Sequence, residues 1–262
     1  MFASLLYAIT LALVLTSGAA SSGPGSHHAS TLAKRAPAQV ITSCTVQNTA
    51  ALTFDDGPWV YLYDVSKTLL AAGAKGTFFF NGNNWGCIYD EDEAKRVKYA
   101  YDKGHQIASH TWLHSNLTLL TADQVHHQMW LVEEALIKIA GVMPAFMRPP
   151  YGAYNDIVRS VSGIRGQTIA NWNFDSGDTW NITTAAEKQR YVDFVKTKPT
   201  SIIALNHDVH QQTAQVLLPF AIQTLQAAGY RLVTLAECLG KPAYQSVAAP
   251  KARDATWTCI GK

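Results

Sequence analysis

The stretch that decides the fold is 50-AALTFDDGP-58, an apolar run that ends in two adjacent aspartates and a Gly-Pro pair. The apolar residues predict a short buried strand, and the Gly-Pro pair predicts a turn where the strand ends. Asp55 and Asp56 should point in different directions, because successive side chains of an extended segment do so. On its own the pair would be an ordinary turn, since Asp, Gly and Pro all favour turns.

Strand-like runs and helix patterns alternate through the rest of the chain. Thr121 with Gln124 predicts a capping box that opens a long helix, and Gly141 predicts its end. Thr184 with Glu187 predicts a second capping box. Such alternation is typical of parallel strands joined by helices, so we expect an α/β fold, a distorted and incomplete (β/α) barrel, with an open three-layer sheet as the alternative. The strand-like runs are AALTF, GTFFF, HQIAS, AFM, QTIANWNF, SIIAL and YRLVTL.

Five of these runs are followed at once by residues that can bind a metal, move a proton or carry charge. In a barrel of parallel strands, all C-terminal strand ends open on one face, where active sites lie. We therefore expect a metal site at the C-terminal ends of the strands. The five segments are DD at 55–56, SHTWLH at 109–114, RPPYG at 148–152, DSGD at 175–178 and NHD at 206–208.

Two histidines of the second segment have the spacing of metal ligands. His110 and His114 are four residues apart, so on a helical turn both project to one side. The alternative is two unrelated polar histidines. With a carboxylate from another strand end, they would form a site with two imidazoles, one carboxylate and an open position, as catalytic zinc requires. One aspartate of the 55–56 pair could then bind the metal while the other faces the water that the metal activates.

Taken together, these segments resemble the polysaccharide deacetylase family (carbohydrate esterase family 4) and, within it, the fungal chitin deacetylases. The motifs TFDDGP, HTWLH, RPPYG, DSGD and LNHD occur in the family's order within residues 44–240. The resemblance implies a metal-dependent hydrolase that removes N-acetyl groups from chitin or chitooligosaccharides. It also implies a divalent cation, Zn²⁺ or another ion such as Co²⁺, bound by Asp56, His110 and His114.

The resemblance also implies the catalytic roles. Asp55 would be the general base, Arg148 would orient it, and His207 would be the general acid. Either Asp178 or Asp175 would tune His207, and the sequence leaves this choice open.

The substrate-binding residues implied by the resemblance come from three of the motifs. The backbone N–H of Tyr151 would hold the oxyanion, and Leu205 would line the pocket for the acetyl methyl group. Pro150 and Trp180 complete the set. The family's fourth motif usually reads D-x-x-D-W, but here Thr179 takes the tryptophan position and Trp180 follows it. We therefore expect the aromatic wall of the pocket to be built differently.

Other readings of the same motifs remain open. The chain could be an acetylxylan esterase or a deacetylase of another acetylated glycan. It could also be a catalytically silent glycan-binding wall protein, although every polar residue that the reaction needs is present.

The chain has the marks of a secreted protein. Residues 1–20 predict a signal peptide, with an apolar centre and small residues at its end. Residues 21–35 are a propeptide candidate, because they end in the dibasic pair Lys34-Arg35. We expect residues 36–262 to be a single catalytic domain with no membrane anchor, located outside the cell or in the cell wall.

Cysteines, glycosylation sequons and charge complete the prediction. Four cysteines allow three pairings, and we favour Cys44–Cys238, which ties the start of the fold to its end, leaving Cys87–Cys259. A net charge of +2 without basic runs gives no sign of nucleic-acid binding. We expect a monomer. The predicted N-glycosylation sites are Asn116 and Asn181.

Overall fold

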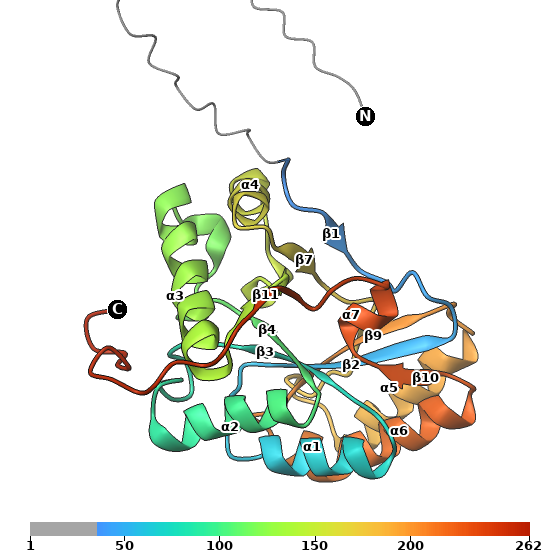
Figure 1. Ribbon diagram of the computed structural model, residues 1–262. Helices are drawn as coiled ribbons and strands as arrows, with labels where there is room; N and C mark the ends of the chain where they lie inside the picture. The colour runs from blue at the N-terminus through green and yellow to red at the C-terminus, as the bar shows by residue number, and fades with distance from the viewer. Residues whose placement is uncertain (1–35) are drawn as a thin grey trace, which may run out of the picture. The chain divides into compact units, whose positions relative to one another are not determined.

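A sheet of nine parallel strands organises residues 36–262, the part of the chain that this computed structural model describes (Figure 1). The predicted signal peptide and propeptide lie outside the described residues. The strand order is β1-β7-β6-β4-β3-β2-β9-β8, and β10 pairs with the start of β2. The strands are β1 (Val40–Ile41), β2 (Thr49–Asp55), β3 (Thr77–Phe80), β4 (Gln106–Ser109), β6 (Phe146–Met147), β7 (Thr168–Ala170), β8 (Phe174–Asp175), β9 (Ile202–His207) and β10 (Arg231–Val233).

The chain connection between β7 and β8 shows that this sheet is curled. In a flat sheet with this order, six strand spacings would separate the two strands, about 29 Å. Only residues 171–173 join them, and four residue steps span at most about 14 Å. The two ends of the sheet therefore approach each other without pairing. The prediction of an incomplete (β/α) barrel is confirmed, and the open three-layer alternative is wrong.

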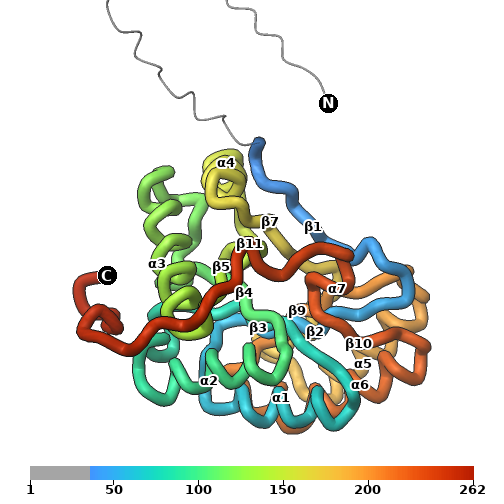
Figure 2. The backbone as a smooth tube through the Cα atoms, viewed as in Figure 1, coloured from blue at the N-terminus to red at the C-terminus, as the bar shows by residue number. Residues whose placement is uncertain are grey.

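Helices cover the outer face of the sheet, and the connections between strands carry them (Figure 2). The capping box at Thr121 is present and opens α3, whereas the helix expected to start at Thr184 has Thr183 as its N-cap instead. The helices are α1 (Leu62–Ala71), α2 (Glu91–Asp102), α3 (Ala122–Ala140), α4 (Asp156–Ile164), α5 (Thr184–Lys196), α6 (Leu218–Ala227) and α7 (Leu235–Leu239). Single turns and a small sheet complete the fold: η1 (Leu117–Leu119), η2 (Pro150–Gly152), η3 (Thr213–Leu217), and β5 (Val142–Pro144) paired antiparallel with β11 (Tyr244–Val247).

Alternation along β2 separates the outer core from the barrel interior. Leu52 and Phe54 pack outward in the large core cluster, together with residues of the surrounding helices. Ala51 packs in a second cluster with inward residues of β3, β4 and β9. By the two-residue period, Thr53 and Asp55 continue the inward column toward the C-terminal end of the strand. The strand therefore delivers Asp55 to the face where the other strands also end.

The short helix α7 closes the N-terminal end of the interior. Its first N–H groups, at Leu235 and Ala236, donate to Thr77 Oγ1 and Gln106 Oε1 at 2.9 and 2.8 Å. Its apolar residues complete the inner cluster. The apolar interior is closed at this end, which leaves its C-terminal end for a site. None of the helices within residues 36–262 is both long and apolar enough to cross a membrane.

Two disulfides crosslink distant parts of the chain. Cys44 pairs with Cys238, and Cys87 pairs with Cys259, the arrangement favoured from the sequence. The first bond joins α7 to the segment before β2. The second joins the C-terminal segment to the loop after β3.

Candidate active site

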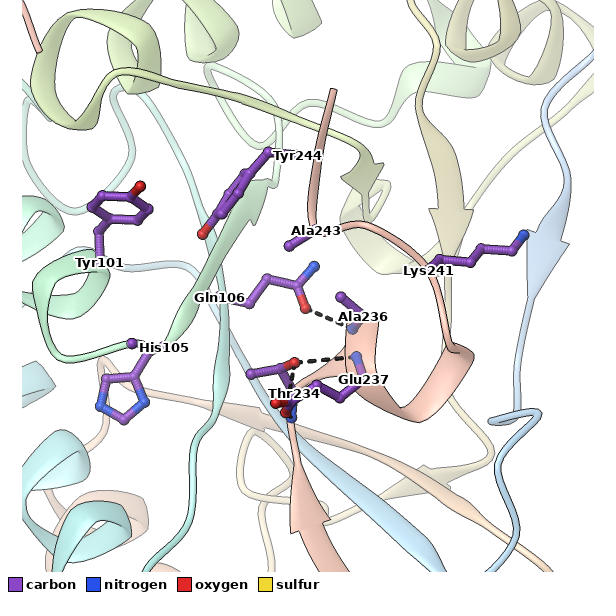
Figure 3. A pocket seen from close by; sticks show the side chains of 10 residues that line it. Tyr101, His105, Gln106, Thr234, Ala236, Glu237, Lys241, Ala243 and Tyr244 are labelled. Atoms are coloured by element: carbon purple, nitrogen blue, oxygen red, sulfur yellow. Dashed lines mark hydrogen bonds between the residues drawn. The ribbon is translucent and has the colours of Figure 1, made fainter. Parts of the chain in front are cut away.

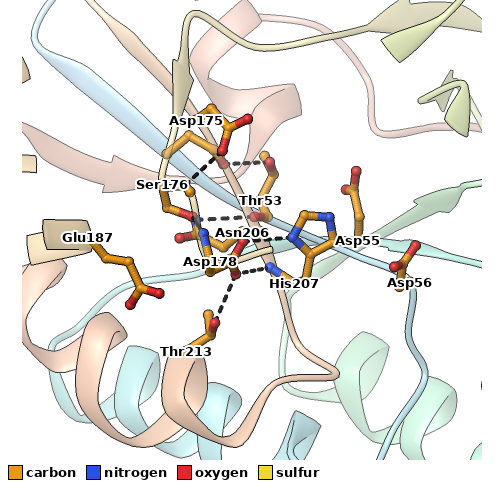
Figure 4. Close-up of polar contacts among 12 residues, drawn as sticks. Thr53, Asp55, Asp56, Asp175, Ser176, Asp178, Glu187, Asn206, His207 and Thr213 are labelled. Carbon is orange, nitrogen blue, oxygen red and sulfur yellow. Dashed lines mark hydrogen bonds and ion pairs between the residues drawn. The ribbon is translucent and has the colours of Figure 1, made fainter. Parts of the chain in front are cut away.

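Sheet register brings Asp55 and His207 together. Asp55 ends β2 and lies directly opposite His207, which ends the neighbouring strand β9. Parallel neighbours are about 4.8 Å apart, so both side chains rise from the same face of the sheet at close range. The close-up in Figure 4 shows the two side chains near each other, with Asp56 beside them. Asp55 is buried, and its Oδ1 accepts a hydrogen bond of 2.8 Å from Arg148 Nη1.

Arg148 is held rigidly under this carboxylate. Its guanidinium is fully buried and donates to Thr53 Oγ1 and to the carbonyl oxygens of Ala170 and Asn171, at 2.7, 2.8 and 3.2 Å. It also lies 4.3 Å from the centre of the Phe79 ring. A planar guanidinium fixed in this way orients a carboxylate better than a mobile cation would. One oxygen of Asp55 is therefore anchored, and the other, Oδ2, remains on the side of the histidines.

Asp56, His110 and His114 form a cluster with the geometry of a metal site. One ligand atom from each lies within 4.8 Å of the others. Asp56 Oδ1 is 3.5 Å from His110 Nε2 and 3.3 Å from His114 Nε2. Asp56 has φ of 75°, which takes it out of the strand and separates its direction from that of Asp55. The two aspartates point in different directions, as predicted. The cause is the left-handed backbone of Asp56 and not the alternation of an extended segment.

The hydrogen bonds around this cluster suit a bound cation. His110 Nδ1 donates to the carbonyl of Arg148 at 2.7 Å, which leaves the Nε2 lone pair directed at Asp56. Asp56 Oδ1 is buried and has no hydrogen-bond partner. A buried carboxylate oxygen without a partner is costly, and a divalent cation would satisfy it. The residues present therefore fit a divalent metal ion.

Burial also sets the protonation of the two imidazoles. It lowers the pKa of His110 and of His114, so both rings are neutral near pH 7 and can act as ligands. Burial raises the pKa of Asp56. A cation between these groups would favour the ionised carboxylate, because opposite charges at close range stabilise each other.

Asp178, and not Asp175, is the partner of His207. Asp178 Oδ1 lies 2.8 Å from His207 Nδ1, while its Oδ2 accepts from the backbone N–H of His207 and from Thr213 Oγ1 (Figure 4). Asp175 Oδ1 instead accepts from the N–H of Gly177. Asp175 is the other predicted candidate for tuning His207. It makes no hydrogen bond with His207, and its carboxylate helps to shape its own turn.

The charge around His207 favours its protonated form. Burial opposes the imidazolium, but the hydrogen bond and negative charge of Asp178, with the charges of Asp55 and Asp56, outweigh burial and raise the pKa of His207 to about 9. Asp178 in turn has a lowered pKa, because the hydrogen bonds from His207 and Thr213 overcome the opposing effect of burial. His207 can therefore hold a proton at neutral pH while its Nε2 side remains available.

Asp55, His207 and the three potential metal ligands line one cavity of about 310 Å³. Of the predicted binding residues, Tyr151 and Leu205 lie in its wall. Its lining residues are Asp55, Asp56, His110, His114, Tyr151, Gly152, Trp172, Asp175, Thr179, Leu205 and His207.

Two predicted binding residues do not line this cavity. Pro150 is buried at the start of the turn η2, where it supports Tyr151 rather than facing the cavity. Trp180 is half-exposed outside the cavity, with the Arg190 guanidinium 4.1 Å from its ring centre. The shift of the motif by one residue explains this, because Thr179 takes the inward position.

Trp172 is the aromatic wall that the sequence reasoning missed. It lies in the connection between β7 and β8 and lines the cavity in place of Trp180. Its position depends on the path of this connection, which no local sequence pattern determines. Thr53 was also missed, although it is two residues before Asp55 and so shares its face. Thr213 follows no motif, and no sequence signal indicates its contact with Asp178.

The two predicted glycosylation sequons lie in different surroundings. Asn116 is partly buried, and its side chain caps the turn η1 by accepting from the N–H of Thr118. Asn181 is exposed in the loop before α5.

Comparisons with known proteins agree with this geometry. Residues 42–169 match the polysaccharide deacetylase family model. The chain is 41% identical to a chitin deacetylase of Pestalotiopsis sp, over 77% of this chain and 67% of that protein. It is 38% identical to the chitin deacetylase of Colletotrichum lindemuthianum, over 82% of this chain and 90% of that protein. The solved structure of a chitin deacetylase from the latter fungus superposes with a TM-score of 0.76 at 33% identity, covering 79% of this chain and 94% of that one. The chain therefore belongs to the polysaccharide deacetylase family.

Proposed function

We propose that the protein is a metal-dependent deacetylase that removes N-acetyl groups from N-acetylglucosamine units of chitin or chitooligosaccharides. The observation that carries this proposal is the single cavity in which an Arg-anchored carboxylate, a carboxylate-paired histidine and a group of three metal-binding residues meet. Two relatives are named chitin deacetylase, and the match to one of them covers 90% of that protein. These relatives support the substrate class.

Asp55 is the proposed general base. Its Oδ1 is occupied by Arg148, so Oδ2 is the oxygen that can take a proton from an attacking water. Oδ2 lies 3.7 Å from His110 Nε2, next to the proposed cation position. A base at this point acts on a water adjacent to the cation, with Arg148 holding its orientation.

His207 is the proposed general acid. Asp178 occupies Nδ1, which leaves Nε2 to deliver a proton to the departing amine. Hydrolysis of an amide needs this step, because an unprotonated amine leaves poorly. Since Asp55 and His207 end neighbouring strands in register and line one cavity, both groups could act on the same acetamide.

Asp56, His110 and His114 would hold the divalent cation, with zinc as the first choice for two imidazoles and one carboxylate. When bound, the cation supplies Lewis-acid polarisation and makes water more acidic. The backbone N–H of Tyr151, at a cavity-lining position, is the proposed protein donor to the oxyanion. No serine or cysteine nucleophile is required.

An aromatic strip next to His207 suits a polysaccharide. The ring centre of His210 lies 6.1 Å from that of His207 and 6.3 Å from that of Trp85. Trp85 is half-exposed. The ring centres of Trp59 and Trp85 are 5.6 Å apart. Exposed aromatic faces of this kind can pack on sugar rings, and they continue away from the site where the acetyl group would be cleaved. Secretion agrees with the two disulfides, which form in oxidising compartments.

Acetate release tests the proposal directly. The purified protein with added zinc should deacetylate chitin oligomers, lose activity in a chelator and regain it when zinc returns. Acetate release from acetylated xylan alone would favour the esterase alternative. Chitin binding that a chelator leaves unchanged, without acetate release, would favour the silent wall protein. His110→Ala should lose zinc binding, and a full equivalent of tightly bound zinc in this variant would contradict the ligand assignment.

A further inference from the structure

The turn that carries His110 and His114 has a strained backbone. Thr111 and His114 have φ angles of 71° and 55°, in the left-handed region, although neither is glycine. Such conformations persist only where the surrounding structure holds them. The placement of both histidines therefore depends on what packs around residues 110–114.

The loop that follows β3 makes the first set of contacts with this turn. Asn81 Nδ2 donates to the carbonyl oxygens of His110 and Thr111 at 2.6 and 3.0 Å. The Trp112 indole is fully buried against Gly82, where a Cβ would lie 1.7 Å from its Cε3 atom. Trp112 thus anchors the turn between the two histidines, and its ring packs directly against the backbone of Gly82.

The C-terminal segment, residues 248–262, runs past α3 (Figure 2). It first runs beside the end of α3, where the N–H of Ala248 donates to the carbonyl of Gly141 at 2.8 Å. Further on, the N–H of Lys251 donates to the carbonyl of Lys138 at 2.9 Å. These bonds fix the course of the segment before it reaches the aromatic residues.

Beyond α3 the segment packs against Tyr89 and Trp112. The Lys262 ammonium lies 4.6 Å from the ring centre of Tyr89 and 5.8 Å from that of Trp112, and the two rings are 6.1 Å apart. The disulfide between Cys87 and Cys259 ties the segment covalently to the loop after β3. The contacts therefore run without interruption from the C-terminal segment through Trp112 to the turn with the histidines.

We propose that the C-terminal segment positions the metal-binding turn by clamping Trp112, so that cation affinity depends on residues outside the active-site cavity. Neither the segment nor Trp112 contributes to the lining of that cavity. Their role is positioning: they touch neither the cation nor the substrate. The inference rests on the metal site of the proposed function, and it adds a determinant of that site's affinity.

The two disulfides provide a matched test. The variant Cys87→Ala/Cys259→Ala releases the segment, whereas Cys44→Ala/Cys238→Ala removes a bond at the other end of the fold. The two bonds span 172 and 194 residues, so their removal should cost similar stability through chain entropy. Zinc affinity would be measured by competition with a chelator, below the melting temperature of both variants.

We expect the zinc Kd to rise roughly 10- to 100-fold when the segment is released, as for the loss of other groups that orient ligands. The control should bind zinc as the unaltered chain does, despite its lower melting temperature. Equal affinities in both variants, or equal losses, would overturn the proposal. Zinc binding by the unaltered chain without acetate release would refute the proposed activity and leave this comparison valid. Absence of zinc binding would overturn both.

A second pair of variants keeps both disulfides. Trp112→Ala should weaken zinc binding, and Trp112→Phe should restore most of the affinity because a ring again fills the space against Gly82. Trp130→Ala, at a half-exposed tryptophan on α3, is the control. Unchanged zinc affinity in folded Trp112→Ala would overturn the clamping role.

Discussion

Two cavities of about 310 Å³ lie at opposite ends of the strands, and each contains a buried histidine. The cavity in Figure 3 lies beside the start of β4 and the helix α7, with His105 in its wall. The cavity at the C-terminal strand ends contains His110, His114 and His207. Equal size and the presence of a buried histidine therefore do not distinguish a site from a structural hollow.

The bonding of the histidines does distinguish them. His105 Nδ1 accepts from the N–H of Gly76 at 3.0 Å, and its Nε2 lies 2.8 Å from Ser66 Oγ. Both nitrogens are used by the fold, and burial together with the charge of Lys75 lowers the pKa of His105 to about 4. The histidine is a neutral crosslink between two strands and a helix.

At the opposite end, two of the three histidines use Nδ1 for support and leave Nε2 for chemistry. His110 and His207 are held through Nδ1 by a carbonyl and a carboxylate, and Asp56 Oδ1 has no hydrogen-bond partner. In this molecule the incompletely bonded histidines lie where the carboxylates gather, whereas both nitrogens of His105 are used by the fold. Substitutions at the two ends should therefore separate activity from stability.

The largest effect is expected for Asp55→Asn. The amide oxygen can still accept from Arg148, so the fold and the metal ligands should be preserved, but the base is lost. We expect kcat for chitin oligomers to fall by roughly 10²- to 10⁴-fold, the usual contribution of general acid–base catalysis. Acetate release measures the loss, and zinc affinity within a few-fold of the unaltered chain is the control. Activity within tenfold of the unaltered chain would refute the role of Asp55.

Next in size is the effect of Asp178→Asn on pH dependence. His207 must carry a proton, so activity should decline as the pH rises through its pKa of about 9. Removing the negative charge and charged hydrogen bond of Asp178 lowers that pKa. The alkaline limb of kcat/KM should therefore move to lower pH.

Asp175→Asn is the matched control for this shift. Asp175 lines the same cavity but makes no hydrogen bond with His207, so its variant should move the alkaline limb much less than Asp178→Asn does. Equal shifts in the two variants would show that the tuning is not specific to Asp178.

The sequence predicted the residues at strand ends and missed those whose position depends on loops. Strand ends could be located from apolar runs, and parallel strands bring their ends together, so the meeting of Asp55, His110 and His207 was predictable. Trp172 and Thr213 were not, because their positions depend on loop paths that no local pattern determines. The choice of Asp178 over Asp175 depends on a single turn, in which Asp175 bonds to Gly177.

A smaller effect is expected for Trp85→Ala. Its half-exposed ring follows His210 in the aromatic strip, so it should contact a sugar unit next to the one that reacts. Loss of such packing costs about 0.5–1.5 kcal/mol, and KM for chitin oligomers should rise roughly 2- to 10-fold with little change in kcat. Trp130→Ala should change neither constant. A fall in kcat without a change in KM would place Trp85 in the chemical step instead.

The smallest effect on turnover is expected for His105→Ala, at the N-terminal end of the strands. The substitution leaves Ser66 and the N–H of Gly76 buried without their partner, which should lower the free energy of unfolding by about 1–3 kcal/mol. Denaturant unfolding measures this loss, and His105→Asn, which can still accept from Gly76, should recover part of it. The folded variant should keep the kcat and zinc affinity of the unaltered chain. A large loss of kcat at a temperature where the variant is fully folded would break the contrast, because it would mean that the two ends of the strands are coupled and that bonding within the fold does not mark a histidine as structural.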